Sequence, residues 1–268
     1  MANKEALRDA VFKAVEAYCA ADFGFSFDPN NPIVRLHEPT FSAGEINAAL
    51  ECLLSTYVTM GPKVKKFEEV FASTFGWTDG VMNNSGSSAN LLAVAALANP
   101  ATKDGLKPGD EVILSIAEHH SNIVPWHFHR ERHGAVIKWI PCDERGVLDL
   151  DAYEKLFTPK TKIVAVSQMS NVLGTINPVA EMIKLAHDAG AVTLIDGAHA
   201  PGMLPLDLSS LGCDLYTGNL HKWAMSPRSS AILWVRREWH ARVRPTVISW
   251  GYGQGLAPEF DLVGTRDP

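Results

Sequence analysis

Short apolar runs alternate with amphipathic segments along the chain from about residue 80 onward. The apolar runs are rich in β-branched side chains, a pattern that predicts buried strands. Helices are expected between them, near residues 123–132, up to residue 157, and over residues 178–190, where Gly190 ends the last one. The expected strands are residues 111–115, 135–140, 162–168, 191–196 and 231–235.

Near-continuous apolar strands separated by helices predict a parallel or mostly parallel sheet. Helices are expected to cover both faces, which gives a three-layer α/β/α fold. Ligands of such sheets bind beyond the carboxyl ends of the strands. The residues that follow the strands are therefore the first candidates for function.

The first 40 residues are expected to form a separate N-terminal segment. Residues 1–24 have the pattern of an amphipathic helix and lack the uninterrupted apolar stretch of a secretory signal. The proline-rich stretch FDPNNPIVRLHEP predicts a linker or extended arm. We place the domain boundary after residue 40, with residues 41–268 as the ligand-binding domain.

Composition narrows the class of protein. The chain has 268 residues, 46% of them hydrophobic, and a net charge of −6, which favours neither nucleic acid nor a membrane as partner. No apolar run approaches the roughly 20 residues of a membrane span. The four cysteines form no CxxC pair, so a reducing cytoplasm and inert thiols are expected. They are Cys19, Cys52, Cys142 and Cys213.

The stretch NNSGSSANLLAVAAL, residues 83–97, places a polar turn directly before an Ala/Leu-rich helix. Free backbone N–H groups at a helix N-terminus, with the hydroxyls of Ser87 and Ser88 after Gly86, favour an anion such as a phosphate. The helix carries no charge that would repel it. A serine-capped helix without a ligand is the alternative.

Asp196 and Lys222 stand out in LIDGAHAPG and DLYTGNLHKWAMSPRSSAIL. Asp196 ends an apolar strand, where a carboxylate is costly unless a cation or a hydrogen-bond donor meets it. A carboxylate that caps the following turn is the alternative. Lys222 lies between two strand-like segments, so we expect it to point into a site.

The stretch AEHHSNIVPW, residues 117–126, follows an expected strand and carries two adjacent histidines. An imidazole there could stack on a heteroaromatic ring, and His221 could donate to a phosphate; ordinary half-buried histidines are the alternative. His129 and His133 are four residues apart but lack the HExxH pattern, and we expect no metal site.

A phosphate site, a stacking imidazole, a carboxylate for a ring nitrogen and a lysine for an aldehyde together describe a pyridoxal 5′-phosphate site. We therefore expect this cofactor, with Lys222 and Asp196 as catalytic residues. A lysine that attacks an aldehyde must lose its proton readily, which desolvation favours.

From about residue 110 onward the sequence resembles the class V aminotransferase family of fold type I pyridoxal-phosphate enzymes. EHHSNIVPW and SNVLGTINPV resemble cysteine desulfurases and selenocysteine lyases. DGAHAPG, YTGNLHKW, SWGYG and GTRDP resemble the isopenicillin-N-epimerase-like branch. The N-terminal third resembles DegT-type sugar-nucleotide aminotransferases in LHEPTFSAGEINAALECL, GPKVKKFEEVFA, NSGSSANLLAVAAL and GLKPGDEVI.

The resemblance implies a role for each matching residue. Lys222 forms a Schiff base with the cofactor, Asp196 keeps the pyridine nitrogen protonated, and His119 stacks on the ring. His199 binds the phenolic oxygen, where desulfurases commonly have Gln. The other implied cofactor contacts are Gly86, Ser87, Ser88 and His221 at the phosphate, Asn219 or Thr217 as a further phosphate ligand, Asn171 near the substrate carboxylate and the phenolic oxygen, and Thr265 at the partner subunit's phosphate.

The resemblance also implies a homodimer and an amino-acid substrate. Family members continue well beyond the GT motif, into a small domain with the arginine that binds the substrate carboxylate and, in desulfurases, a catalytic cysteine. That C-terminal small domain is expected to be missing from this chain, and none of its four cysteines matches the catalytic one.

The expected function is that of a pyridoxal-phosphate enzyme that acts on an amino acid in the class V aminotransferase or epimerase-like manner. A cysteine desulfurase or selenocysteine lyase is one alternative. A sugar-nucleotide aminotransferase and a non-catalytic scaffold that binds the cofactor are the others.

Overall fold

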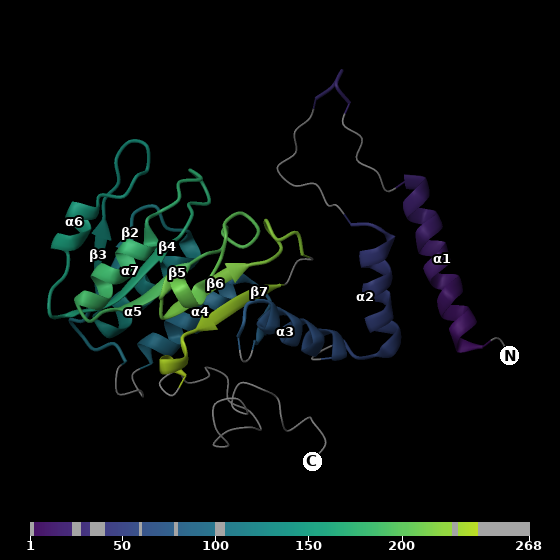
Figure 1. Ribbon diagram of the computed structural model, residues 1–268, viewed down its shortest axis with the longest axis horizontal. Coiled ribbons are helices and arrows are strands. Elements are labelled where there is room, and N and C mark those ends of the chain that lie inside the picture. Colours follow the sequence, from purple (N-terminus) through teal and green to yellow (C-terminus); the bar gives the residue numbers. More distant parts are fainter. Residues whose placement is uncertain are drawn as a thin grey trace, which may run out of the picture. The chain divides into compact units, whose positions relative to one another are not determined.

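The computed structural model describes residues 3–22, 28–32, 41–58, 61–77, 80–99, 105–226 and 230–240 (Figure 1). The chain divides into two compact units, Met1–Phe67 and Glu68–Pro268. The boundary predicted after residue 40 stays a prediction, because residues 33–40 lie outside the described part.

The first unit contains helices α1 (Lys4–Asp22) and α2 (Ala43–Ser55), which contact each other. The helix expected near the N-terminus is therefore present as α1. A capping box starts α2, because Ser42 accepts from the first turn while its own N–H donates to Glu45 at 2.7 Å. Most of the predicted arm lies outside the described residues.

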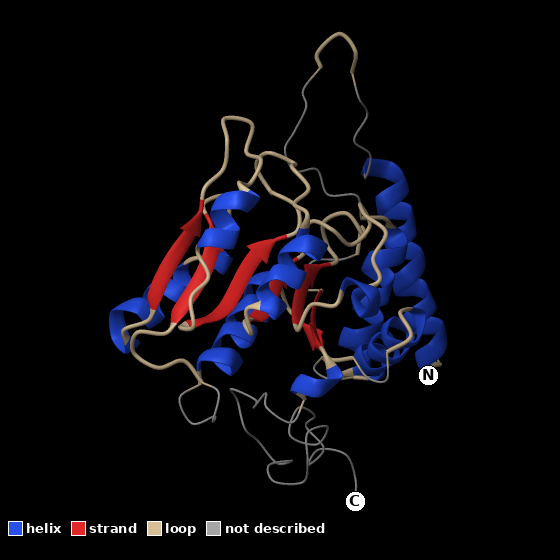
Figure 2. Cartoon of the chain, turned by 60° about the vertical axis from the view of Figure 1, so that its left-hand side comes forward, coloured by secondary structure: helices blue, strands red, loops and turns tan. Residues whose placement is uncertain are grey.

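The second unit is built on one sheet with the strand order β1-β7-β6-β5-β4-β2-β3 (Figures 1 and 2). Strands β3, β2, β4, β5 and β6 run parallel to one another. Strand β7 is antiparallel to both of its neighbours, β6 and β1. The mostly parallel sheet predicted from the sequence is confirmed.

The predicted strands agree with the observed ones to within about two residues. The apolar pattern does not predict strands β1 and β6, because their sequences, MN and LYTGN, contain few apolar side chains. The strands are β1 (Met82–Asn83), β2 (Glu111–Ser115), β3 (Val136–Ile140), β4 (Thr161–Ser167), β5 (Val192–Asp196), β6 (Leu215–Asn219) and β7 (Ala231–Val235). The helices are α3 (Pro62–Thr74), α4 (Gly86–Ala98), α5 (Val124–His133), α6 (Leu150–Lys155), α7 (Val179–Asp188) and α8 (Leu208–Leu211).

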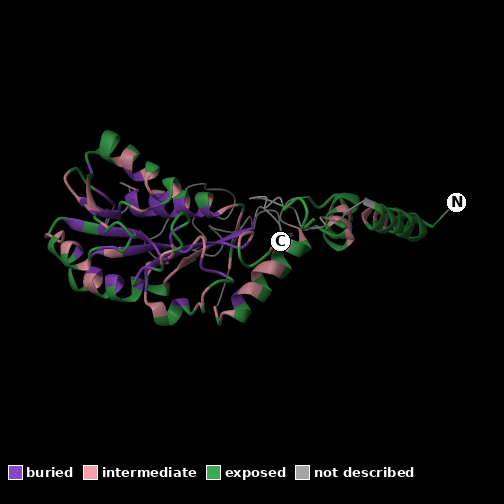
Figure 3. Cartoon of the chain, turned by 90° about the horizontal axis from the view of Figure 1, so that it is seen from above, coloured by how far each residue is buried: buried purple, intermediate pink, exposed green. Residues whose placement is uncertain are grey.

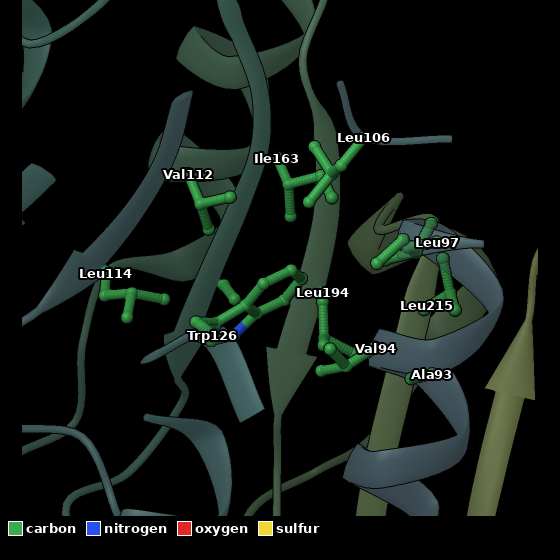
Figure 4. Packing of buried hydrophobic residues seen from close by; sticks show 12 residues of the cluster. Ala93, Val94, Leu97, Leu106, Val112, Leu114, Trp126, Ile163, Leu194 and Leu215 are labelled. Carbon is green, nitrogen blue, oxygen red and sulfur yellow. The ribbon is translucent and has the colours of Figure 1, made fainter. Parts of the chain in front are cut away.

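Helices cover both faces of this sheet. Val112 and Leu114 of β2 pack with α4 residues and Trp126 of α5 in one core cluster, whose centre holds the Trp126 ring next to Leu194 (Figure 4). Successive strand residues point to opposite faces, so the buried Ile113 lies on the other side. Helix α7 contacts β4 and β5 and buries Met182. Figure 3 shows buried residues concentrated in the sheet and on inner helix faces, which confirms the three-layer architecture.

This arrangement brings the carboxyl ends of the parallel strands to one edge. Each fully buried aliphatic or aromatic side chain beneath it contributes about 1.5–3 kcal/mol. In the described part of the chain, no helix combines the length and the apolar character that crossing a bilayer requires.

Candidate active site

Asp196 is the last residue of β5 and is only 2% exposed. Its Oδ2 accepts a hydrogen bond of 2.7 Å from Asn90 Nδ2, and its Oδ1 accepts one of 2.9 Å from the Ala198 backbone N–H. The charge of Lys222 acts on it electrostatically without a direct ion pair. Asp196 is thus a buried acceptor held by two neutral donors, an arrangement suited to a further cationic partner.

Lys222 lies three residues after the end of β6, and its Nζ is 2.7 Å from His199 Nε2. The indole Nε1 of Trp223 donates to the other ring nitrogen of His199, Nδ1, at 3.1 Å. Burial lowers the pKa of Lys222, although the negative charge of Asp196 opposes this. Burial and then the positive charge of Lys222 lower the pKa of His199. Both effects favour neutral side chains.

His119 lies in the loop after β2 and is exposed. Its Nδ1 accepts from the Ser121 backbone N–H at 3.1 Å and lies 2.8 Å from Ser121 Oγ. Asn90 Nδ2 also reaches Ser121 Oγ, at 3.2 Å. A continuous chain of hydrogen bonds therefore joins Asp196 to His119 through Asn90 and Ser121.

The N-terminus of α4 is braced against the end of β6. The Gly86 N–H donates to Asn219 Oδ1 at 2.6 Å, and a Cβ at Gly86 would lie 2.6 Å from the Asn219 amide nitrogen. Ser85, which sequence reasoning missed, caps the helix by accepting from the Ser88 N–H at 3.1 Å. Ser87 is exposed and its N–H has no bond among the described residues.

The phosphate turn therefore differs in part from the expected one. Two backbone N–H groups of the turn, those of Gly86 and Ser88, already donate to protein side chains. The side-chain carbonyl oxygen of Asn219 accepts one of these bonds, so it supports the turn instead of facing an anion. Ser87 is left for a phosphate, and the hydroxyl of Ser88, which accepts from Ser85 Oγ at 3.1 Å, can still donate to one. The Thr217 hydroxyl donates to Asn90 Oδ1 at 2.6 Å, so it supports Asp196 indirectly.

His221, Asn171 and Thr265 complete the predicted set. Nδ1 of His221 is buried and has no hydrogen-bond partner within the described chain. Asn171 lies in the loop after β4, is exposed, and makes no side-chain contact with the other predicted residues that the structure describes. Thr265 lies outside the described residues, and its role stays a prediction.

Glu118 is a buried carboxylate beside His119 that the sequence did not single out. Four donors surround it: the hydroxyls of Ser115 and Ser167 at 2.5 Å each, the Ser167 N–H at 2.9 Å and Asn122 Nδ2 at 2.8 Å. Burial raises its pKa, and the hydrogen bonds oppose this. Glu118 ties the loop that carries His119 to the end of β4.

The described residues fit pyridoxal 5′-phosphate. Asp196 is a buried carboxylate without an ion-pair partner among the described residues, which suits a protonated ring nitrogen. The orphaned Nδ1 of His221 and the unbonded amide of Ser87 are available to a phosphate. Lys222 has the lowered pKa that an amine needs in order to attack an aldehyde.

The sequence profile described as "Aminotransferase class-V" matches residues 59–254. The chain belongs to the class V aminotransferase family. Pyridoxal 5′-phosphate is the cofactor of this family, so the cofactor expected from the sequence is confirmed. The resemblance of the N-terminal third to DegT-type aminotransferases is not confirmed by these comparisons.

The curated relatives of the chain include cysteine desulfurases. A cysteine desulfurase of Klebsiella pneumoniae is 40% identical over 186 residues, which cover 67% of this chain and 45% of the relative. A probable cysteine desulfurase of Pseudomonas aeruginosa is 45% identical over 130 residues, 48% of this chain and 32% of the relative. The chain therefore spans less than half the length of these relatives.

Solved structures show the same fold. The apo cysteine desulfurase of Thermococcus onnurineus matches with a TM-score of 0.66 and 25% identity, over 84% of this chain and 55% of the other. A cysteine desulfurase of Escherichia coli matches with a TM-score of 0.63 and 24% identity, over 95% and 65% of the two chains.

The residues that the sequence missed share one property. Each carries a polar group that supports a predicted residue, either by a hydrogen bond to it or by fixing the loop that carries it: Ser85, Asn90, Glu118, Ser121 and Trp223. Their signal in the sequence is weak, because a polar residue in a helix or turn is ordinary. Only the tertiary fold brings Asn90 within hydrogen-bond distance of a residue 106 positions away.

Proposed function

We propose that this chain is the cofactor-binding part of a cysteine desulfurase, the alternative that the sequence left open. The observation that carries this proposal is the arrangement of Asp196, Lys222 and His119 at one sheet edge, in a chain that is 40% identical, over 186 residues, to a cysteine desulfurase. The EHHSNIVPW and SNVLGTINPV stretches support the same branch.

The bound cofactor would supply an electron sink for the substrate α-carbon. Asp196 would hold the protonated ring nitrogen, His119 would lie against the ring, and Ser87 and His221 would bind the phosphate. Lys222 would bind the aldehyde carbon. The neutral Nζ of Lys222 can then accept a proton from the substrate α-carbon and return it, because burial keeps its pKa lowered.

The overall reaction transfers the sulfur of L-cysteine to a thiol. Cysteine and a thiol R–SH give alanine and the persulfide R–S–SH, so the Cβ–S bond breaks and a new S–S bond forms. With excess dithiothreitol as thiol and reductant, the persulfide is released as sulfide. Alanine and sulfide are then expected in equal amounts.

The test incubates the protein with pyridoxal 5′-phosphate, L-cysteine and dithiothreitol, and measures alanine, sulfide and D-cysteine. Equimolar alanine and sulfide, absent in Lys222→Ala, support the proposal. Sulfide without matching alanine, or D-cysteine without sulfide, contradicts it.

Amino-acid epimerisation is a second candidate, favoured by His199 at the position where desulfurases commonly have Gln and by the DGAHAPG and YTGNLHKW stretches. It predicts D-cysteine, or the other enantiomer of a different amino acid, without sulfide. A homodimer and a cytoplasmic location stay predictions in either case.

A further inference from the structure

The ring of His199 lies between two nitrogen atoms with different hydrogen-bonding abilities. The indole Nε1 of Trp223 lies 3.1 Å from His199 Nδ1, and Lys222 Nζ lies 2.7 Å from His199 Nε2. An indole N–H can only donate. His199 Nδ1 must therefore accept, and it carries no proton while this hydrogen bond exists.

The protonation of Nδ1 determines that of the second ring nitrogen, Nε2. A neutral imidazole carries one proton, so His199 holds it on Nε2 and donates it toward Lys222. The doubly protonated ring would direct an N–H at the N–H of Trp223. An ammonium at Lys222 would likewise direct an N–H at the N–H of His199. The three side chains fit together when His199 and Lys222 are both neutral.

The backbone fixes Trp223 in this position. Gly202 has φ +87, and a Cβ there would lie 2.3 Å from the Trp223 carbonyl oxygen. The turn that carries His199 thus packs directly on the backbone of Trp223, and only glycine allows this approach. This contact holds the backbone of Trp223 next to the turn that carries His199.

We propose that Trp223 is a positioning residue: its indole N–H selects the Nε2–H tautomer of His199, which in turn favours the neutral amine of Lys222. The lowered pKa values of His199 and Lys222 agree with this. The proposal deepens the proposed function, because it rests on Lys222 as the residue that binds the cofactor. An N–H donor fixed beside Lys222 also suits an anionic oxygen at that place.

The first test is nuclear magnetic resonance of the whole chain labelled with ¹⁵N-histidine, before and after pyridoxal 5′-phosphate is added. The His199→Phe variant identifies the His199 signals. The wild-type protein is expected to show the Nε2–H tautomer, and Trp223→Phe a mixture of tautomers. Trp139→Phe, at the opposite edge strand β3, serves as the control and is expected to match the wild type.

The second test measures how fast Lys222 is acetylated in the cofactor-free chain, by peptide mass spectrometry. Trp223→Phe is expected to slow acetylation roughly three- to tenfold near neutral pH, the range of one lost hydrogen bond. In a His199→Phe background the same change should have no effect, because Trp223 acts through His199.

An Nδ1–H tautomer in the wild type, or the same tautomer in the wild type and Trp223→Phe, overturns the proposal. So does an equal slowing of acetylation in the His199→Phe background. Neither readout uses cysteine turnover, so a protein without desulfurase activity can still pass both tests, and a desulfurase can fail them.

Discussion

The side chain of Asn90, in the second turn of α4, donates a hydrogen bond of 2.7 Å to the carboxylate of Asp196 at the end of β5. Asn90 is 1% exposed and its carbonyl oxygen accepts from the Thr217 hydroxyl at 2.6 Å. One amide thus joins a helix and two strands beneath the site. The orientation of Asp196 depends on this amide, and no local sequence pattern predicts the contact between them.

Asn90→Ala should destabilise the fold and weaken the site together. It removes one of two donors to a buried carboxylate and leaves the Thr217 hydroxyl unpaired, at a cost of about 1–3 kcal/mol in unfolding free energy. Denaturant unfolding and cofactor titration measure both effects. Leu91→Ala, on the exposed side of the same helix, is the control. Equal behaviour of the two variants would contradict the role of Asn90.

Glu118 should make the protein less stable as pH rises. Its pKa is raised by burial from the ordinary 4.5, so the folded protein binds the proton more tightly than the unfolded chain. The stability that Glu118 contributes is fully present below pH 4.5 and is lost as the pH rises through its pKa in the folded protein. Above pH 4.5, the unfolding free energy of the wild type should fall with rising pH relative to that of Glu118→Gln.

Glu111 is the matched control, because its contribution to stability should change with pH in the opposite direction. Burial alone would raise its pKa, but the ion pair with Lys138 at 2.7 Å and hydrogen bonds from Thr158 and Thr161 outweigh this and lower it. Its stabilisation is present above pH 4.5 and lost as pH falls through the folded pKa. The wild type should therefore lose stability relative to Glu111→Gln on acidification. The same pH trend for both glutamates would refute the assignment.

Gly202→Ala should cost more than Gly174→Ala. Both glycines have positive φ, +87 and +69, so both variants incur about 1–2 kcal/mol of backbone strain. A Cβ at Gly202 also meets the Trp223 carbonyl at 2.3 Å, whereas one at Gly174 meets nothing within 4 Å. The difference in unfolding free energy between the two variants measures the cost of placing a Cβ against the Trp223 carbonyl. If it is absent, the two loops are not held together there.

Asp214 should affect stability without affecting the cofactor site. It lies just before β6, at the opposite end of that strand from Lys222, and is 4% exposed. Its carboxylate accepts from Thr193, His187 and Trp239 and pairs with Arg236 at 3.4 Å. Asp214→Ala should lower the unfolding free energy by about 3 kcal/mol. Under conditions in which the variant stays folded, its cofactor attachment should match that of the wild type. Loss of cofactor attachment under those conditions would contradict the prediction that Asp214 acts on stability alone.

The layer architecture could be predicted because it depends on local patterns. Apolar runs such as 162–168 and 191–196 are buried on both faces of the sheet, so their hydrophobicity alone marks them as strands. Strand β6 carries Thr217, Gly218 and Asn219, and its burial depends on partners across the sheet. The antiparallel pairing of β7 with β6 is likewise not encoded in its apolar pattern.

The positions of the candidate site residues in the fold could be predicted because each follows a strand or starts a helix. Asp196, Lys222 and His119 all lie at the carboxyl edge, as expected of a parallel sheet. The predicted phosphate role of Asn219 did not anticipate that its carbonyl oxygen binds Gly86. Asn171 lies at the same edge, without a side-chain contact to the other site residues that the structure describes. Such pairings depend on side-chain geometry between distant segments, which spacing does not reveal.

The most direct test of the account is to locate the residue that holds the cofactor. The protein is loaded with pyridoxal 5′-phosphate, reduced with borohydride, digested and mapped by mass spectrometry. The account predicts the cofactor mass on the peptide at Lys222, and no stable attachment in Lys222→Ala. Attachment to a different lysine, or unchanged attachment in Lys222→Ala, would contradict it.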